Sequence, residues 1–186
     1  QALQPYFGCT GIAHTRWATH GEPSGANAHP HISAQRVALV HNGIIENHEA
    51  LRQELSAQGY TFDSATDSEV IVHLLHECLS RGVNLVQAMR DTVARLEGAY
   101  ALAVVDVEHP DEVVAARQGS PLVIGVGIGE NFLASDPMAL RQVTDRFMYL
   151  EEGDLVQITP SSLQVYAADG SPVQREKIRI DEAVEV

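Results

Sequence analysis

The spacing of the apolar residues changes along the chain, and this change restricts the fold more than any other feature. Between residues 47 and 98, apolar residues recur at every third or fourth position, as they do on one face of an amphipathic helix. From Tyr100 onward they fall in short runs separated by turn residues, as in strands. Helices that are neighbours in sequence, followed by many short strands, favour α+β layers over a βαβ alternation.

The spacing also gives approximate bounds. Helices are expected over 47–58, from 67 or 68 to about 81, and from 84 to about 98. Asn84 and Gln87 resemble a capping box for the third helix. The expected strands are 11–14, 36–41, 60–62, 100–107, 113–117, 122–126, 131–134, 147–150, 154–159 and 163–166, with a helical turn or two at 137–141. Residues from 174 onward are polar and are expected to be a linker or a frayed end.

The charge balance excludes several classes of partner. The chain has 25 acidic and 12 basic residues, a formal net charge of −13, which leaves no polybasic stripe for nucleic acid or an anionic membrane. No apolar run approaches the ~20 residues of a membrane span, and residues 1–10 do not resemble a signal peptide. Cys9 and Cys78 do not make a disulfide framework, so a cytoplasmic location is expected.

Histidines are numerous, nine in all, yet their spacing does not predict a metal site. The sequence has no H-E-x-x-H or C-x-x-C motif. His29 and His31 flank a proline, and His73 and His76 have no evident third ligand. The glycines at 125–129 have the wrong spacing for a nucleotide-binding loop and predict a hairpin turn. We therefore expect neither a metal nor another cofactor.

One loop has a composition that suits ligand binding. Arg16, Trp17, Thr19 and His20 lie within five positions of a stretch rich in Gly, Pro and Ser, and Trp17 is the only tryptophan. A solvated loop rarely carries a tryptophan, and an arginine can hold a carboxylate through two parallel hydrogen bonds. The loop is therefore a candidate site for an acidic group.

Two further positions allow either a structural or a chemical role. Asn42 and Gly43 follow a buried strand, where they form a turn or offer a side-chain amide and a backbone N–H as an oxyanion hole. Asp67, at a helix start, either caps the helix or holds a substrate ammonium group. From the residue types alone, the turn and the cap are the favoured interpretations.

Four sequence strings, taken together, point to a family. They are HTRWATHGEPS at 14–24, NAHPH at 27–31, HNGIIEN at 41–47 and TDSE at 66–69. In this order and spacing they closely resemble the class II glutamine amidotransferase domain. Within that class they are similar to the enzymes that form glucosamine 6-phosphate from fructose 6-phosphate. The combination of Trp17 and His20 fits those enzymes better than the purine-pathway amidotransferase.

The resemblance implies a fold and a reaction. The fold is an α+β sandwich of the N-terminal-nucleophile hydrolase type, with four layers in the order αββα. Residues 1–173 would be the amidotransferase domain, and 174–186 a linker or tail. The domain would hydrolyse L-glutamine and pass the ammonia to a separate sugar-isomerising domain of the same full-length enzyme, with a homodimer as the expected assembly.

The resemblance also implies roles for individual residues. Arg16 would hold the α-carboxylate of glutamine and Asp67 its α-ammonium group. The Asn42 side chain and the Gly43 N–H would form the oxyanion hole. Trp17 would lie at the exit toward an ammonia channel. Thr19 and His20 would bind substrate from the same loop as Arg16.

The first residue departs from the family pattern. The family's nucleophile is a cysteine at residue one, whereas this chain begins with Gln1. We therefore expect a domain that lacks its nucleophile-bearing first elements, is inactive alone and self-associates through an unpaired sheet edge. The alternatives are a non-catalytic module that binds glutamine or a partner, a related amidotransferase with another acceptor, and a relocated nucleophile at Cys9.

Overall fold

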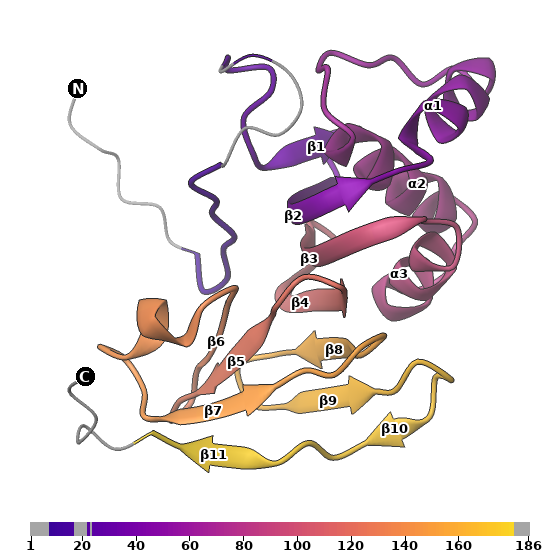
Figure 1. Cartoon of the computed structure of the whole chain (residues 1–186). Helices are drawn as coiled ribbons and strands as arrows, with labels where there is room; N and C mark the ends of the chain where they lie inside the picture. The colour runs from indigo at the N-terminus through magenta and orange to yellow at the C-terminus, as the bar shows by residue number, and fades with distance from the viewer. Residues whose placement is uncertain (1–7, 17–21, 23, 181–186) are drawn as a thin grey trace.

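The computed structural model describes residues 8–16, 22 and 24–180. Figure 1 shows helices stacked against one sheet, with a second sheet beyond it. The helices are α1 (His48–Ala57), α2 (Ser68–Ser80), α3 (Leu85–Val93) and the 3₁₀ turn η1 (Pro137–Leu140). The strands are β1 (His31–Ser33), β2 (Val37–Ile45), β3 (Gly98–Asp106), β4 (His109–Gln118), β5 (Val123–Val126), β6 (Asn131–Ala134), β7 (Arg146–Tyr149), β8 (Leu155–Ile158), β9 (Leu163–Tyr166), β10 (Pro172–Val173) and β11 (Lys177–Arg179).

The strands form two antiparallel sheets. One sheet has seven strands in the order β1-β2-β3-β4-β8-β9-β10, and the other has four in the order β11-β7-β5-β6. Alternate residues of β3 face opposite cores. Leu102 and Val104 pack against α2 and α3, whereas Ala101 and Ala103 face the second sheet. The predicted α+β layering is therefore present.

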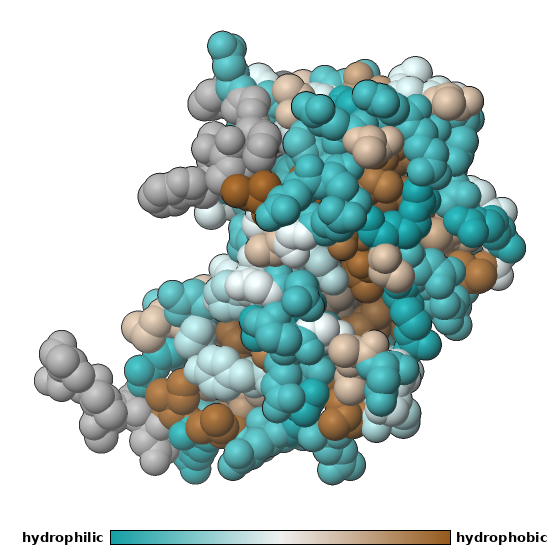
Figure 2. Space-filling model, turned by 45° about the vertical axis from the view of Figure 1, so that its right-hand side comes forward, coloured by the Kyte–Doolittle hydropathy of each residue, from teal (hydrophilic) through white to brown (hydrophobic). Residues whose placement is uncertain are grey.

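Apolar packing on the outer face of the four-stranded sheet is thinner. Phe147 and Val123 are buried there beneath Leu140 of η1. Nearby, Tyr149 and Ile178 remain 42% and 44% exposed. Seen from the side in Figure 2, the surface is mostly hydrophilic, and apolar residues gather mid-molecule and toward its lower end. In the described part of the chain, η1 is the only helical element on that outer face.

The helix predictions hold within one or two residues at most ends, but the capping pattern is more varied. Asn84 caps α3 as predicted, because its Oδ1 accepts a hydrogen bond from the Gln87 backbone N–H at 2.8 Å. Asn47 and Asp67 occupy N-cap positions without a side-chain cap bond. Asn47 instead joins the start of α1 to the segment before β3, by hydrogen bonds with Arg95 and Glu97.

Four of the predictions for strands and loops are wrong. Residues 11–14 and 60–62 form no strand, because their backbones have no partner strand. Their apolar side chains still pack onto the cores: Ile12 contacts the core between the sheets, and Tyr60 and Phe62 contact α1 and α2. Strand β2 continues through Asn42 and Gly43 to Ile45, so this pair is not a turn. The expected frayed end contributes β11, which pairs with β7. The hairpin turn at 125–129 is confirmed between β5 and β6.

Candidate active site

The site begins at a strand edge that β1 leaves open. Strand β1 pairs with β2 only from Val37 to Leu39, whereas β2 runs on to Ile45. The Glu46 N–H donates to the Glu97 carbonyl. Because N–H groups alternate sides along an antiparallel strand, those of residues 43 and 45 point away from β3, toward the open edge. The Gly43 N–H therefore faces the space beyond β1.

Only glycine fits at position 43. Its φ of +135° lies in a region that side chains rarely adopt. A Cβ built there would lie 2.0 Å from the Ala99 carbonyl oxygen on β3. Gly43 thus combines a positive φ with a strand that passes β3 too closely for any side chain.

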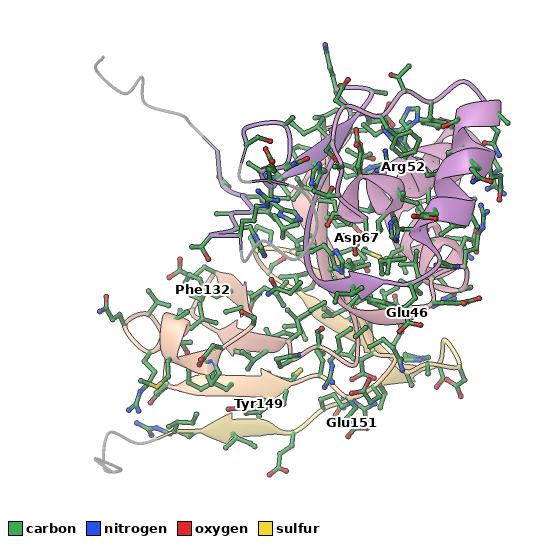
Figure 3. All side chains as sticks on the ribbon, turned by 45° about the horizontal axis from the view of Figure 1, so that its top comes forward. Glu46, Arg52, Asp67, Phe132, Tyr149 and Glu151 are labelled. Atoms are coloured by element: carbon green, nitrogen blue, oxygen red, sulfur yellow. The ribbon has the colours of Figure 1, made fainter. Side chains whose placement is uncertain are left out.

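Asp67 closes part of the same edge. Its Oδ2 accepts a hydrogen bond from the Ile45 N–H at 2.8 Å, and the residue is 3% exposed. No described residue donates to the other carboxylate oxygen, Oδ1. In Figure 3, Asp67 lies among the side chains between the helices and the seven-stranded sheet. The side chain thus joins the start of α2 to β2 rather than capping the helix, and keeps one oxygen available.

The loop before Asp67 is fixed by a buried carboxylate. Glu69 accepts hydrogen bonds from the Asp63 N–H, the Ser64 N–H and the Ser64 hydroxyl at 2.8, 2.8 and 2.6 Å. Burial alone would raise the pKa of Glu69, but these bonds and the neighbouring His73 lower it to about 2. Arg52 donates to carbonyls of the same loop (Figure 3). The loop is therefore rigidly tied to α1 and α2.

Arg16 lies opposite this loop. It adopts a φ of +54°, and its Nη1 donates to the Glu22 carbonyl at 3.1 Å. Asn27 donates to the same carbonyl at 2.9 Å and accepts from the Ala65 N–H at 2.9 Å. Asn27 thereby connects the Arg16 loop with the Asp67 loop. The three other predicted loop residues, Trp17, Thr19 and His20, lie outside the described residues.

Histidines surround the base of the site. The rings of His14 and His29 are 4.3 Å apart, and the Ser68 hydroxyl lies 3.1 Å from His29 Nε2 and 2.9 Å from His41 Nδ1. Burial lowers the pKa of His29 to about 3 and that of His41 to about 4, although Asp67 opposes the second shift. These two rings are therefore neutral at physiological pH.

One cavity brings the predicted residues together. It has a volume of about 230 Å³ and is lined by His14, Arg16, His29, His41, Asn42, Gly43, Ile44, Thr66, Asp67 and Ser68. It thus presents an arginine, a carboxylate, a side-chain amide and a backbone N–H. The roles of the lining histidines and of Ser68 were missed by residue-type reasoning, although all of them fall inside the four sequence strings.

The two cysteines lie elsewhere. Cys9 is exposed and lines a different cavity, together with residues of β6 and the 158–161 turn. Cys78 is buried on α2, and burial raises the pKa of its thiol. Within the described residues, no group of three or more His, Cys, Asp or Glu side chains could hold a metal ion. No helix there is both long and apolar enough to cross a membrane.

The fold and the site define the class. Over 83% of this chain, the structure superposes on glutamine phosphoribosylpyrophosphate amidotransferase from B. subtilis, complexed with ADP and GMP, with a TM-score of 0.69 and 27% identity, covering 34% of that chain. The allosteric regulatory enzyme of purine biosynthesis gives a TM-score of 0.68 and 28% identity over the same shares. This likeness confirms the amidotransferase sandwich of the N-terminal-nucleophile hydrolase type.

The sequence comparisons give the family. The profile described as "Glutamine amidotransferase domain" matches residues 14–142, and the chain belongs to this family. It is 60% identical over 187 residues to glutamine–fructose-6-phosphate aminotransferase [isomerizing] of Pseudomonas syringae pv. tomato. That match covers the whole chain and 31% of the relative. The Escherichia coli K12 enzyme of the same name is 56% identical over 174 residues, 94% of this chain and 28% of the relative. The chain thus spans about 30% of the length of these relatives.

Proposed function

We propose that this chain is the glutaminase part of a glutamine–fructose-6-phosphate aminotransferase. At this site the full-length protein would hydrolyse L-glutamine to glutamate, and the ammonia would be used elsewhere in the protein to convert fructose 6-phosphate to glucosamine 6-phosphate. One observation carries the proposal: a single cavity holds Arg16, Asp67 and the Asn42–Gly43 pair. The names of the relatives support the sugar acceptor.

The cavity's charges suit a free amino acid. Arg16 would bind the α-carboxylate through its guanidinium, and Asp67 the α-ammonium group through Oδ1. With His29 and His41 neutral, the permanent charges lining the cavity are those of Arg16 and Asp67. A zwitterion is therefore matched at both of its charged groups.

The reacting amide would lie at the strand edge. In the full-length protein the thiolate would come from the family's cysteine at residue one. When it attacks the glutamine carbonyl carbon, negative charge develops on the oxygen, and the Gly43 N–H and the Asn42 amide would donate to it. The leaving nitrogen then gains a proton as the C–N bond breaks, so that ammonia departs and a thioester remains. Water hydrolyses the thioester, which releases glutamate and restores the thiol. Neither Cys9 nor Cys78 lies in this cavity, so we propose that this chain alone binds glutamine without hydrolysing it.

The remaining roles follow the resemblance. Trp17 would lie toward the ammonia exit, while Thr19 and His20 would complete the substrate loop. Residues 1–173 would be the amidotransferase unit, with the 174–186 segment leading from it toward a sugar-isomerising domain. We further propose a homodimer without a cofactor, and a cytoplasmic location, since neither described cysteine forms a disulfide.

Calorimetric binding of L-glutamine to this chain tests the site. Arg16→Lys keeps the charge but loses the planar fork, so we expect it to weaken binding about 10- to 100-fold. Asp67→Asn should do the same, by removing the partner of the ammonium group. The control is Arg146→Lys, at an exposed arginine of β7, which should bind like the wild type. Equal affinity in all of these proteins would contradict the site assignment.

Ammonia release by the full-length protein encoded with this chain tests the reaction. We expect glutamine-dependent ammonia release and the formation of glucosamine 6-phosphate from fructose 6-phosphate. Binding of glutamine without ammonia release would favour the alternative, a non-catalytic glutamine-binding module. Ammonia release that is insensitive to fructose 6-phosphate would favour an amidotransferase with another acceptor.

A further inference from the structure

We propose that His14 is a positioning residue: it fixes which way the Asn42 amide points, and it couples that amide to the backbone of Arg16. The inference rests on the proposed glutaminase function, because it assigns Asn42 to the oxyanion hole and Arg16 to the substrate carboxylate. His14 itself would contact neither the carbonyl oxygen nor the carboxylate. It would act through the two residues that do.

The main chain sets the tautomer of His14. The Arg16 backbone N–H lies 2.9 Å from His14 Nδ1 and can only donate, so Nδ1 must accept. In a neutral imidazole, the proton is then on Nε2. His14 Nε2 lies 2.6 Å from Asn42 Oδ1. The ring therefore donates to the amide oxygen of Asn42.

This hydrogen bond determines the orientation of the amide. With Oδ1 held by His14, both Nδ2 hydrogens of Asn42 remain available, and no described residue accepts from them. A reversed amide would place its carbonyl oxygen where a donor is needed, and that oxygen would repel the developing oxyanion. Without the bond to His14, the Asn42 amide could rotate between these two orientations. Because the bond holds the NH2 group in place beforehand, the amide does not have to reorganise during the reaction.

The same ring supports the carboxylate end of the site. Arg16 has a φ of +54°, a left-handed conformation that is unfavourable for a residue with a Cβ. The bond from its N–H to His14 Nδ1 helps to hold that conformation. His14 is in turn packed against the neutral ring of His29, at 4.3 Å between centroids. One side chain thus connects the two ends of a bound glutamine.

Two conservative variants separate the two hydrogen bonds. The amide of glutamine at position 14 places its NH2 near the position of Nε2, so His14→Gln keeps the donor to Asn42. The shorter asparagine places its oxygen near Nδ1, so His14→Asn keeps the acceptor for Arg16. His14→Phe keeps a ring and removes both. His109→Gln, at a histidine of the distant β3–β4 hairpin, is the matched control.

The experiment measures glutaminase kcat and KM of the full-length protein. We expect His14→Asn to lower kcat about 10- to 100-fold with little change in KM, and His14→Gln to raise KM several-fold with kcat largely kept. His14→Phe should change both, and His109→Gln neither. A uniform loss of folded protein, or equal effects of the Gln and Asn variants, would overturn the proposal.

A double-mutant cycle tests whether His14 acts through Asn42. Asn42→Ala should lower kcat about 10²–10³-fold. If His14 only orients this amide, adding His14→Asn to Asn42→Ala should lower kcat no further. Multiplying losses would refute the positioning role while leaving the oxyanion assignment intact. A wild-type protein that neither binds glutamine nor releases ammonia would instead refute the proposed function.

Discussion

Mild acid should destabilise this fold through a buried histidine. His41 is 4% exposed, and burial lowers its pKa from 6.5 to about 4 in the folded state. As pH falls below 6.5, the unfolded chain gains a proton that the folded chain does not bind until about pH 4. The free energy of unfolding therefore falls through this window as pH decreases. Between pH 7 and pH 5, these two pKa values give a loss of about 2 kcal/mol for His41.

Other groups with shifted pKa values either add to this loss of stability in mild acid or act outside the range from pH 7 to pH 5. Burial also lowers the pKa values of His29 and His31, so both add to the loss in the same direction. The stabilisation from Glu69, whose pKa is lowered to about 2, is complete above pH 4.5 and is lost only below it. The range from pH 7 to pH 5 therefore reports mainly on histidines.

Urea unfolding followed by circular dichroism at both pH values measures the effect. His41→Asn can keep an acceptor near Ser68, and its neutral side chain should make the loss between pH 7 and pH 5 about 2 kcal/mol smaller than in the wild type. Any change in the free energy of unfolding that the substitution causes equally at both pH values cancels in this difference. His109→Gln is the control, because this histidine is exposed on the β3–β4 hairpin and lies outside the cavity. A wild-type protein equally stable at both pH values would refute the reasoning.

Three further substitutions test the framework around the site. Gly43→Ala should lower the free energy of unfolding, measured in urea, by more than about 3 kcal/mol, because a Cβ would overlap β3. Gly82→Ala is the control: Gly82 has open space around it, so this variant should lose only about 1 kcal/mol. Glu69→Gln should lower the melting temperature at pH 7, and the difference from the wild type should shrink as pH falls from 4.5 toward 2. Arg175→Ala should also lower the melting temperature, since it leaves the buried Asp154 without its bidentate partner. An unchanged melting temperature would show that the segment after 174 does not stabilise the fold.

The helices and most strands could be predicted because their signals are local. The apolar period of α2 and the Asn84 cap of α3 depend on residues close in sequence, and the structure confirms both. Residues 60–62 were mispredicted because an apolar run does not say whether its backbone finds a partner strand. Here the side chains of Tyr60 and Phe62 pack on helices instead.

The sequence could single out Arg16, Asn42, Gly43 and Asp67 as candidates, but it could not give the geometry of the cavity that they line. Local chemistry could not decide whether Asp67 caps a helix or binds elsewhere, because the competing donor, the Ile45 N–H, is 22 residues away. It could not show that Asn42 and Gly43 lie within a strand, since that depends on β3 running alongside. The family strings supplied this long-range information, because each string carries residues that meet only in the fold.

The open strand edge explains why fold and site depend on the same residues. An unpaired edge is usually a liability, because its N–H groups can recruit another strand. Here the short β1 leaves the edge open, Asp67 occupies it at Ile45, and the Gly43 N–H remains available in a fixed direction. The neutral histidines keep extra positive charge out of the cavity, so the charge of Asp67 is available to an ammonium group. Burying those rings is also what makes the fold sensitive to acid. Stability should decline from about pH 6.5 downward as the unfolded chain binds protons, whereas the folded chain should lose affinity for glutamine only near pH 4 and below, where the rings themselves gain a charge.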